Sequence, residues 1–303
     1  TNIDGVNASV SIKYYRDDGS LITTESFVLP SAGETIKQWK TIYDTFGVSS
    51  GSAWITSNNA VIIKPSQAVD VEGGLGFWSG YAYDTSGTKF YIPELVYLND
   101  PAGTRSNFKL TNLGSATATV TITYLYLNGT VIGTKSDSLA AGGTKIYNWQ
   151  TEVYNTYGIT EGSAIVQSGQ KLAVVAARAR NTGADIDNYK GVPMDTAGMH
   201  IFAYGLKYGA NSTSNLTISN MAGTASSVTL RFLDKNGAGI TTISDTLAGG
   251  ESKRYNWKAL IYDVWGKPEG SVEITSNGQT AVLVSENLIS PQGRLGYFGG
   301  EII

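Results

Sequence analysis

Residues 118 to 129 read Ala-Thr-Val-Thr-Ile-Thr-Tyr-Leu-Tyr-Leu-Asn-Gly, and this stretch decides the fold. Apolar residues alternate with threonines from Ala118 to Tyr124, which is the period of a strand that is buried on one face. The dipeptide Asn128-Gly129 follows, and it is the pair that a two-residue type I′ turn favours. A second apolar run, Thr130-Val131-Ile132, comes directly after it. The stretch therefore predicts an antiparallel hairpin.

The same hairpin pattern occurs three times in the chain, at intervals of about 110 residues. Asn128-Gly129 corresponds to Asp18-Gly19 and to Asn236-Gly237. Each copy also carries a tryptophan ten residues after a leucine, at Trp39, Trp149 and Trp257. Because about 110 residues can bury a core of their own, each copy is expected to be a domain and not one turn of a solenoid. We place the three domains at residues 1–83, 84–194 and 195–303.

The first copy starts late in the repeat. The second and third copies open with Asp84-Thr85-Ser86-Gly87 and Asp195-Thr196-Ala197-Gly198, but Thr1 aligns with Thr111, so about 27 residues are absent from the first copy. A missing strand leaves unpaired backbone groups at the edge of a sheet, and a partner usually covers such an edge. We therefore expect open edges that support head-to-tail self-association between identical subunits, through strand addition or end contacts, at Val10, Ile12 and Tyr14 and at Ile302 and Ile303.

The rest of the pattern indicates an all-β chain. Short strands with turn signals every 8 to 12 residues, and no long amphipathic helix, are typical of a sandwich. One short stretch in each copy could be helical, residues 150–157 in the second. The Cys-Trp-Cys spacing of immunoglobulin domains is missing, since the chain has no cysteine. We predict three tandem Ig-like antiparallel β-sandwich domains, of which the first lacks its opening strand or strands.

Composition excludes several classes of partner. The chain has 22 Lys and Arg against 25 Asp and Glu, with no basic cluster for phosphates, so we expect no nucleic-acid partner. No apolar run is long enough for a spanning helix, so we expect no membrane insertion. Disulfides and thiolate sites are excluded by the absence of cysteine. The wealth of Ser, Thr, Asn, Gly and Tyr indicates an extracellular protein.

A family resemblance is carried by several segments of the third copy. These are Ser-Asn-Leu-Thr-Ile-Ser-Asn at 214–220, Ala-Ser-Ser-Val-Thr-Leu-Arg-Phe at 225–232, Thr-Leu-Ala-Gly-Gly at 246–250 and Glu-Gly-Ser-Val-Glu-Ile-Thr-Ser-Asn at 269–277. The pattern resembles the tandem Ig-like sandwich repeats of large prokaryotic cell-surface and secreted proteins. The resemblance implies a surface location and a role as a fibre or filament, surface layer or adhesin stalk. It brings no catalytic residue.

The residues themselves show little chemistry. His200 is the single histidine, and no G-x-S-x-G elbow or H-E-x-x-H motif is present. We expect no enzyme activity, no cofactor and no metal site, and we place His200 at the surface or at a strand edge.

The aromatic residues leave two alternatives open. The repeated Trp39, Trp149 and Trp257 either pack inside each domain, which we favour, or form a platform for a sugar ring. The second alternative makes the protein a carbohydrate-binding or adhesive module with a glycan partner. A second aromatic group is expected to dock neighbouring domains against one another, and it consists of Phe77, Trp78, Tyr297 and Phe298.

Overall fold

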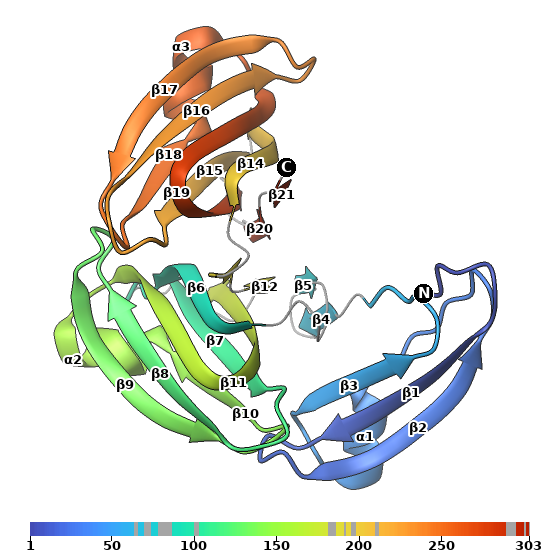
Figure 1. Cartoon of the computed structure of the whole chain (residues 1–303). Coiled ribbons are helices and arrows are strands. Elements are labelled where there is room, and N and C mark those ends of the chain that lie inside the picture. The colour runs from blue at the N-terminus through green and yellow to red at the C-terminus, as the bar shows by residue number, and fades with distance from the viewer. Residues whose placement is uncertain are drawn as a thin grey trace.

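The computed structural model describes residues 1–63, 66–69, 74–77, 87–99, 103–180, 186–190, 192–194, 198–209, 212–288, 295–299 and 301–302. The chain is all-β and its strands pair in antiparallel sheets. Three groups of strands follow one another along an arc (Figure 1). We call them unit one (residues 1–77), unit two (87–194) and unit three (198–302). No helix among the described residues is long and apolar enough to cross a membrane.

Unit two shows the complete topology. Its elements are β6 (Gly87–Val96), β7 (Thr104–Asn112), β8 (Ala118–Leu125), β9 (Val131–Leu139), β10 (Thr144–Asn148), the π-helical turn η2 (Gln150–Tyr154), α2 (Asn155–Tyr157), β11 (Glu161–Arg180), β12 (Ile186–Lys190) and β13 (Val192–Pro193). The first part of β11 pairs with β6 and β8, and its last part pairs with β7 and β12. One long strand therefore runs through both halves of the sheet, and the apolar core gathers side chains from both halves.

Unit three repeats these pairings strand for strand. Its elements are β14 (Gly198–Gly209), β15 (Ser212–Asn220), β16 (Ser226–Asp234), β17 (Gly239–Leu247), β18 (Ser252–Asn256), η3 (Lys258–Tyr262), α3 (Asp263–Trp265), β19 (Glu269–Leu288), β20 (Leu295–Gly299) and β21 (Glu301–Ile302). The register repeats as well, because β8 pairs Leu125 with Ser163 and β16 pairs Leu233 with Ser271. The periodicity read from the sequence thus corresponds to a periodicity of topology.

Unit one contains part of this topology. It has β1 (Ala8–Tyr15), β2 (Leu21–Leu29), α1 (Trp39–Phe46), β3 (Ser52–Ser57), β4 (Ser66–Val69) and β5 (Gly74–Phe77). Among its described residues there is no counterpart of β6, and a single bridge, Asn2 to Val61, stands where β7 pairs with β11 in unit two. The long strand is accordingly broken into β3 and β4, since a strand persists only where its backbone groups find partners.

The position of the open edge differs from the expectation. Strand β1, which carries Val10, Ile12 and Tyr14, is hydrogen-bonded to β2 on one side and to β3 on the other, so it is the central strand. The edge that β6 would cover therefore belongs to β3. At the other end, Ile302 pairs with Ile201 of its own unit, and Ile303 lies outside the described residues. Alternation identifies buried strands but not their order in a sheet.

The cores of the units differ in closure. Trp149 and Trp257 are 0% and 1% exposed, and each indole Nε1 donates to a carbonyl ten residues later, that of Ile159 or Lys267, at 3.0 Å. Trp39 makes the matching bond to Val48 at 2.9 Å but is partly exposed. No strand among the described residues of unit one covers this side of its core.

Candidate assembly site at the joints between units

Successive units touch through the tip of the repeated hairpin. We call residues 17–19, 127–129 and 235–237 the hairpin tips, and residues 30–33, 140–143 and 248–251 the receiving turns. Between units two and three, the backbone N–H of Ser252 donates to the Leu127 carbonyl at 2.7 Å, and Asn128 forms a β-bridge with Glu251. The hairpin tip of unit two therefore adds its backbone to the receiving turn of unit three.

The joint between units one and two is built in the same way. The N–H of Thr144 donates to the Asp17 carbonyl at 2.8 Å, and Thr144 and Asp17 are the counterparts of Ser252 and Leu127. The side chains of the accepting residues, Leu127 and Asp17, differ completely, whereas Ser252 and Thr144 both carry a hydroxyl group. Backbone geometry, not side-chain identity, is what the two joints share.

The glycine of the hairpin tip is required for two reasons, its backbone conformation and its close contact with the next unit. Gly19 and Gly129 have φ of 86° and 84°, in the left-handed region that the turn demands. A Cβ on Gly19 would also lie 2.2 Å from the Ala141 carbonyl oxygen, and a Cβ on Gly129 would lie 2.3 Å from that of Gly249. The sequence predicted the turn, and the structure adds a close contact across the joint.

A buried asparagine holds each receiving turn in place. The Nδ2 of Asn112 donates to the carbonyls of Ala116, Leu139 and Ala140 at 2.8, 3.1 and 3.0 Å. Asn220 and Asn2 make the same three contacts in units three and one. The sequence analysis missed these residues, although an asparagine at equal positions in all three copies is a visible signal.

The joint between units two and three also has an apolar centre. Tyr91, Leu125 and Met194 from unit two pack with Met221 and Ala281 from unit three. All five side chains are buried. Burial of this surface between units favours one fixed orientation.

The Tyr91 hydroxyl completes this centre. It donates to the Gly250 carbonyl at 3.0 Å and lies 2.8 Å from Ser163 Oγ and 3.0 Å from Ser252 Oγ. Burial raises the pKa of the Tyr91 hydroxyl, so the group stays a donor. A buried polar atom is thereby satisfied from both units.

A buried carboxylate lies beside the apolar centre. Glu94 is 3% exposed, and its oxygens accept from Arg178 at 2.8 Å and from Thr217 of unit three at 3.3 Å. Arg254 of unit three lies 3.5 Å from Glu94 and 3.5 Å from the exposed Glu161. These contacts tie β6 to the sheet of unit three.

Among the described residues, the joint between units one and two has no counterpart of the Tyr91 and Glu94 contacts. Tyr91 and Glu94 lie on β6, and unit one has no described counterpart of that strand. Leu113 and Ala173 of unit two, the counterparts of Met221 and Ala281, are consequently half-buried, whereas Met221 and Ala281 are 4% and 1% exposed. The missing strand thus weakens a joint as well as a core.

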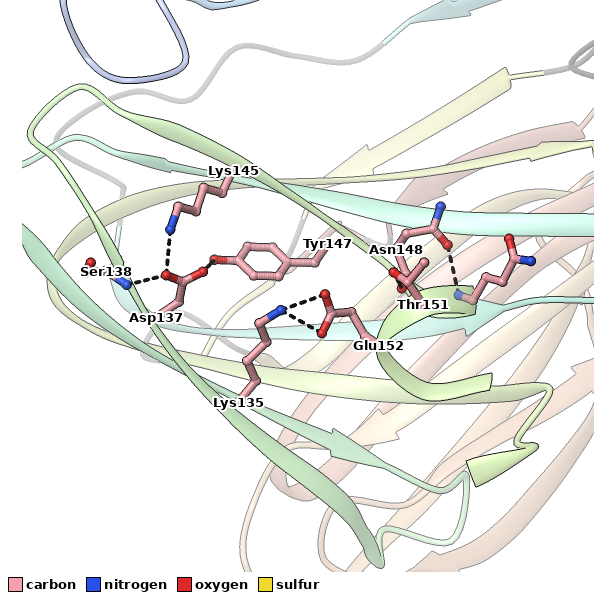
Figure 2. Close-up of polar contacts among 9 residues, drawn as sticks. Lys135, Asp137, Ser138, Lys145, Tyr147, Asn148, Thr151 and Glu152 are labelled. Atoms are coloured by element: carbon pink, nitrogen blue, oxygen red, sulfur yellow. Dashed lines mark hydrogen bonds and ion pairs between the residues drawn. The ribbon is translucent and has the colours of Figure 1, made fainter. Parts of the chain in front are cut away.

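An ion-pair clasp closes the side of unit two (Figure 2). Asp137 on β9 accepts from Lys145 Nζ at 2.6 Å and from the Tyr147 hydroxyl at 3.1 Å, both on β10. Lys135 reaches Glu152 at 2.7 Å. Since β9 pairs with β8 and β10 pairs with β7, the clasp joins the edges of the two halves of the sheet.

The charge states of the clasp residues suit a structural contact. The hydrogen bond from Lys145 holds the pKa of Asp137 below its usual range, and burial raises the pKa of Tyr147. The carboxylate is therefore charged and the phenol neutral near pH 7. Unit three repeats the arrangement, because Asp245 accepts from Lys253 and from the Tyr255 hydroxyl.

The remaining predicted residues lie on different elements of the fold. Trp149 and Trp257 are enclosed, so neither presents a ring face to a sugar, which corrects the platform alternative for these two residues. Phe77 lies in β5, and Tyr297 and Phe298 lie in β20. Strand β12 of unit two is in contact with both β5 and β20, and Trp78 lies outside the described residues.

His200 lies on β14 and contacts Glu273 at 2.9 Å, and Arg231 reaches the same carboxylate at 3.1 Å. Within the described ranges no group of three or more His, Cys, Asp or Glu could hold a metal ion.

Comparison with known proteins adds little. No family model and no curated protein matches the chain. The crystal structure of Thermotoga maritima 1070 is similar over 36% of this chain and 97% of its own, with 14% identity and a TM-score of 0.32. A β-glucuronidase of Bacteroides uniformis is similar over 70% of this chain and 26% of its own, with 11% identity and a TM-score of 0.15. These scores are too low to support an inference about fold or function.

Proposed function

We propose that the chain is a non-catalytic, extracellular structural segment of a prokaryotic surface fibre, surface layer or adhesin stalk. In this proposal its units are tandem Ig-like β-sandwich domains, the first without its opening strands. The observation that carries it is the repeated joint, in which Leu127 and Asp17 accept the same backbone hydrogen bond from the next unit. The composition rich in Ser, Thr, Asn and Gly supports a location outside the cell.

A stalk or fibre needs units that do not rotate freely. Domains joined only by a linker move relative to one another, and a buried interface prevents this. Here the hairpin tips are fitted so closely to the receiving turns that no Cβ fits at Gly19 or Gly129. Such joints keep the curvature of the arc in Figure 1 constant.

Small-angle scattering of Gly129→Ala tests the rigidity. The methyl group would lie 2.3 Å from the Gly249 carbonyl oxygen, so we expect the joint to open and the radius of gyration to rise. Gly158→Ala is the matched control, because Gly158 has φ of 71° and nothing within 4 Å of its Cβ position. If the two variants scatter alike, the joint does not fix the units.

Antibody labelling of intact cells of the source organism tests the location, and labelling only after lysis would contradict it.

An adhesive function is the second candidate, and one observation favours it. Phe46, Tyr157 and Trp265 occupy equal positions at the ends of the three helical turns and are 43%, 49% and 51% exposed. Exposed aromatic rings are suited to stacking on sugars. Titration of soluble glycans against Trp fluorescence tests it. A saturable shift that Trp265→Ala abolishes would support adhesion, and no shift with any glycan would remove it.

A further inference from the structure

We infer that the chain assembles head to tail with identical copies, by docking the hairpin tip of unit three onto the receiving turn of unit one in the next copy. This inference rests on the proposed structural function and names its partner, a second copy. Both internal joints show this contact, and the inference places the same contact between the two ends of the arc.

The hairpin tip of unit three has the conformation of a docked tip, but no described residue of the chain receives it. Gly237 has φ of 82°, and its N–H bonds to Asp234 at 2.9 Å, as Gly129 bonds to Tyr126 at 3.0 Å. Among the described residues nothing lies within 4 Å of a Cβ on Gly237. This tip is therefore preformed and accessible.

The receiving turn of unit one is preformed too. Asn2 holds it with the same three hydrogen bonds that Asn112 and Asn220 make, and Gly33 bonds to Pro30 at 2.8 Å. Ala32 has φ of 55°, matching the left-handed glycines at this position in the other turns. A non-glycine residue adopts this conformation at a cost, so the turn keeps its docking shape although no described residue of the chain fills it.

The methyl group of Ala32 fits the joint. A Cβ on its counterpart Gly142 would lie 3.5 Å from the Gly19 oxygen, and one on Gly250 would lie 3.4 Å from Gly129 Cα. These are tolerable contacts. Glycine is required in the tip, because a Cβ there would lie 2.2 or 2.3 Å from a carbonyl oxygen of the receiving turn, but it is not required in the turn. The proposed joint follows this rule, since it has Gly237 in the tip and Ala32 in the turn.

The surfaces around the two elements are complementary. Ile3 and Ile62 are 57% and 56% exposed, at the positions where unit three carries the buried Met221 and Ala281. Phe202 on β14 of unit three takes the place of Tyr91 and would cover them. Apolar residues that are exposed here but buried in the equivalent joint indicate a protein–protein interaction surface.

Charge adds specificity at the backbone contact. The residue pair that exchanges the hydrogen bond is Leu127 with Ser252 in one joint and Asp17 with Thr144 in the other. At the proposed joint the corresponding pair is Lys235 of one copy and Glu34 of the next. Lys235 lies 3.4 Å from Glu269 of its own unit, and both side chains are exposed, so docking would bring Glu34 of the next copy to the same lysine. Opposite charges at this contact favour head-to-tail contact over contact between like ends.

Sedimentation velocity over a concentration series tests the inference on the whole chain. We expect the mass to rise with concentration above that of the 32.2 kDa monomer. In Gly237→Ala the methyl group would collide with the Ser31 carbonyl of the next copy, so association should weaken by at least about tenfold. Gly266→Ala is the matched control, since Gly266 has φ of 65° in the same unit and nothing within 4 Å.

Cysteine cross-linking identifies the contact, because the chain has no cysteine of its own. The double variant Lys235→Cys with Glu34→Cys should give an oxidised ladder in steps of one chain, and either single variant should not. A monomer at all concentrations, or assembly that Gly237→Ala leaves intact, would overturn the inference; the latter would indicate strand addition at β3. Either result would leave the proposed rigid segment standing, which fails only if Gly129→Ala and Gly158→Ala scatter alike.

Discussion

Trp149 packs directly against Gly162, so closely that a Cβ on the glycine would lie 2.7 Å from Cη2 of the indole. The Leu125 carbonyl oxygen would lie at 2.3 Å from the same Cβ. Trp257 and Gly270 repeat the relationship at 2.7 Å, and Trp39 and Gly51 repeat it at 2.6 Å. The repeated tryptophan and the repeated Gly-Ser pair are therefore two sides of one contact.

Gly162→Ala is expected to lower the stability of unit two by about 1–3 kcal/mol, because an added methyl group in a closely packed site forces strain on its neighbours. Differential scanning calorimetry measures the shift of the corresponding transition. Gly169→Ala in the same strand is the control, since nothing lies within 4 Å of its Cβ position. Equal melting of the two variants would show that the indole can move away at no cost.

Asn220→Ala should loosen the receiving turn of unit three. The variant loses donors to three carbonyls, of Thr224, Leu247 and Ala248, at a cost of about 1–3 kcal/mol. Hydrogen exchange of the amides in residues 248–252 is expected to accelerate, since the turn they belong to loses its anchor. Unchanged exchange in this segment would mean that the backbone bonds of the turn suffice.

The strands and the hairpins could be predicted from the sequence, because alternation and the Asn-Gly and Asp-Gly pairs specify them locally. The short helical turn could be predicted because a glycine, Gly158, ends it in the left-handed conformation. Packing of Trp149 and Trp257 inside their domains was the favoured interpretation of the repeat, and it is confirmed. The order of strands is a tertiary property, which is why the open edge was expected at Val10 to Tyr14 and lies at β3.

The candidate site was harder to foresee. Gly129 was expected to serve a turn, and nothing in the sequence shows that Gly249 lies against it. Asn112 and Tyr91 act on backbone carbonyls that are distant along the chain, and a carbonyl has no sequence signature. The Asn112 contacts depend on the fold of unit two, and the Tyr91 contact depends on the packing of unit two against unit three.

Acid should weaken the clasps of units two and three. Hydrogen bonds from Lys145 and Lys253 lower the pKa of Asp137 and Asp245. A folded-state pKa below the unfolded value contributes stability that is present above the unfolded pKa, about 3.9, and is lost as the pH falls through the folded pKa. Urea midpoints between pH 7 and pH 2 should therefore fall less steeply in Asp137→Asn with Asp245→Asn than in the parent chain. If the urea midpoint falls equally steeply in the double variant, the loss of stability in acid belongs to other carboxylates.

Two glutamates that contact the same arginine should differ in importance at the joint between units two and three. Arg254 lies 3.5 Å from both Glu94 and Glu161, whose side chains are 3% and 41% exposed. Glu94→Gln removes a buried charge that also faces Arg178, and a broken buried pair costs several kcal/mol, so we expect a loss of at least about 2 kcal/mol. Glu161→Gln removes an exposed pair and should cost less than about 1 kcal/mol. Calorimetry of the transitions of units two and three compares them. Glu94→Gln should also raise the radius of gyration, because Glu94 bonds to Thr217 across the joint, and equal effects of the two substitutions would show that burial of Glu94 does not hold the units together.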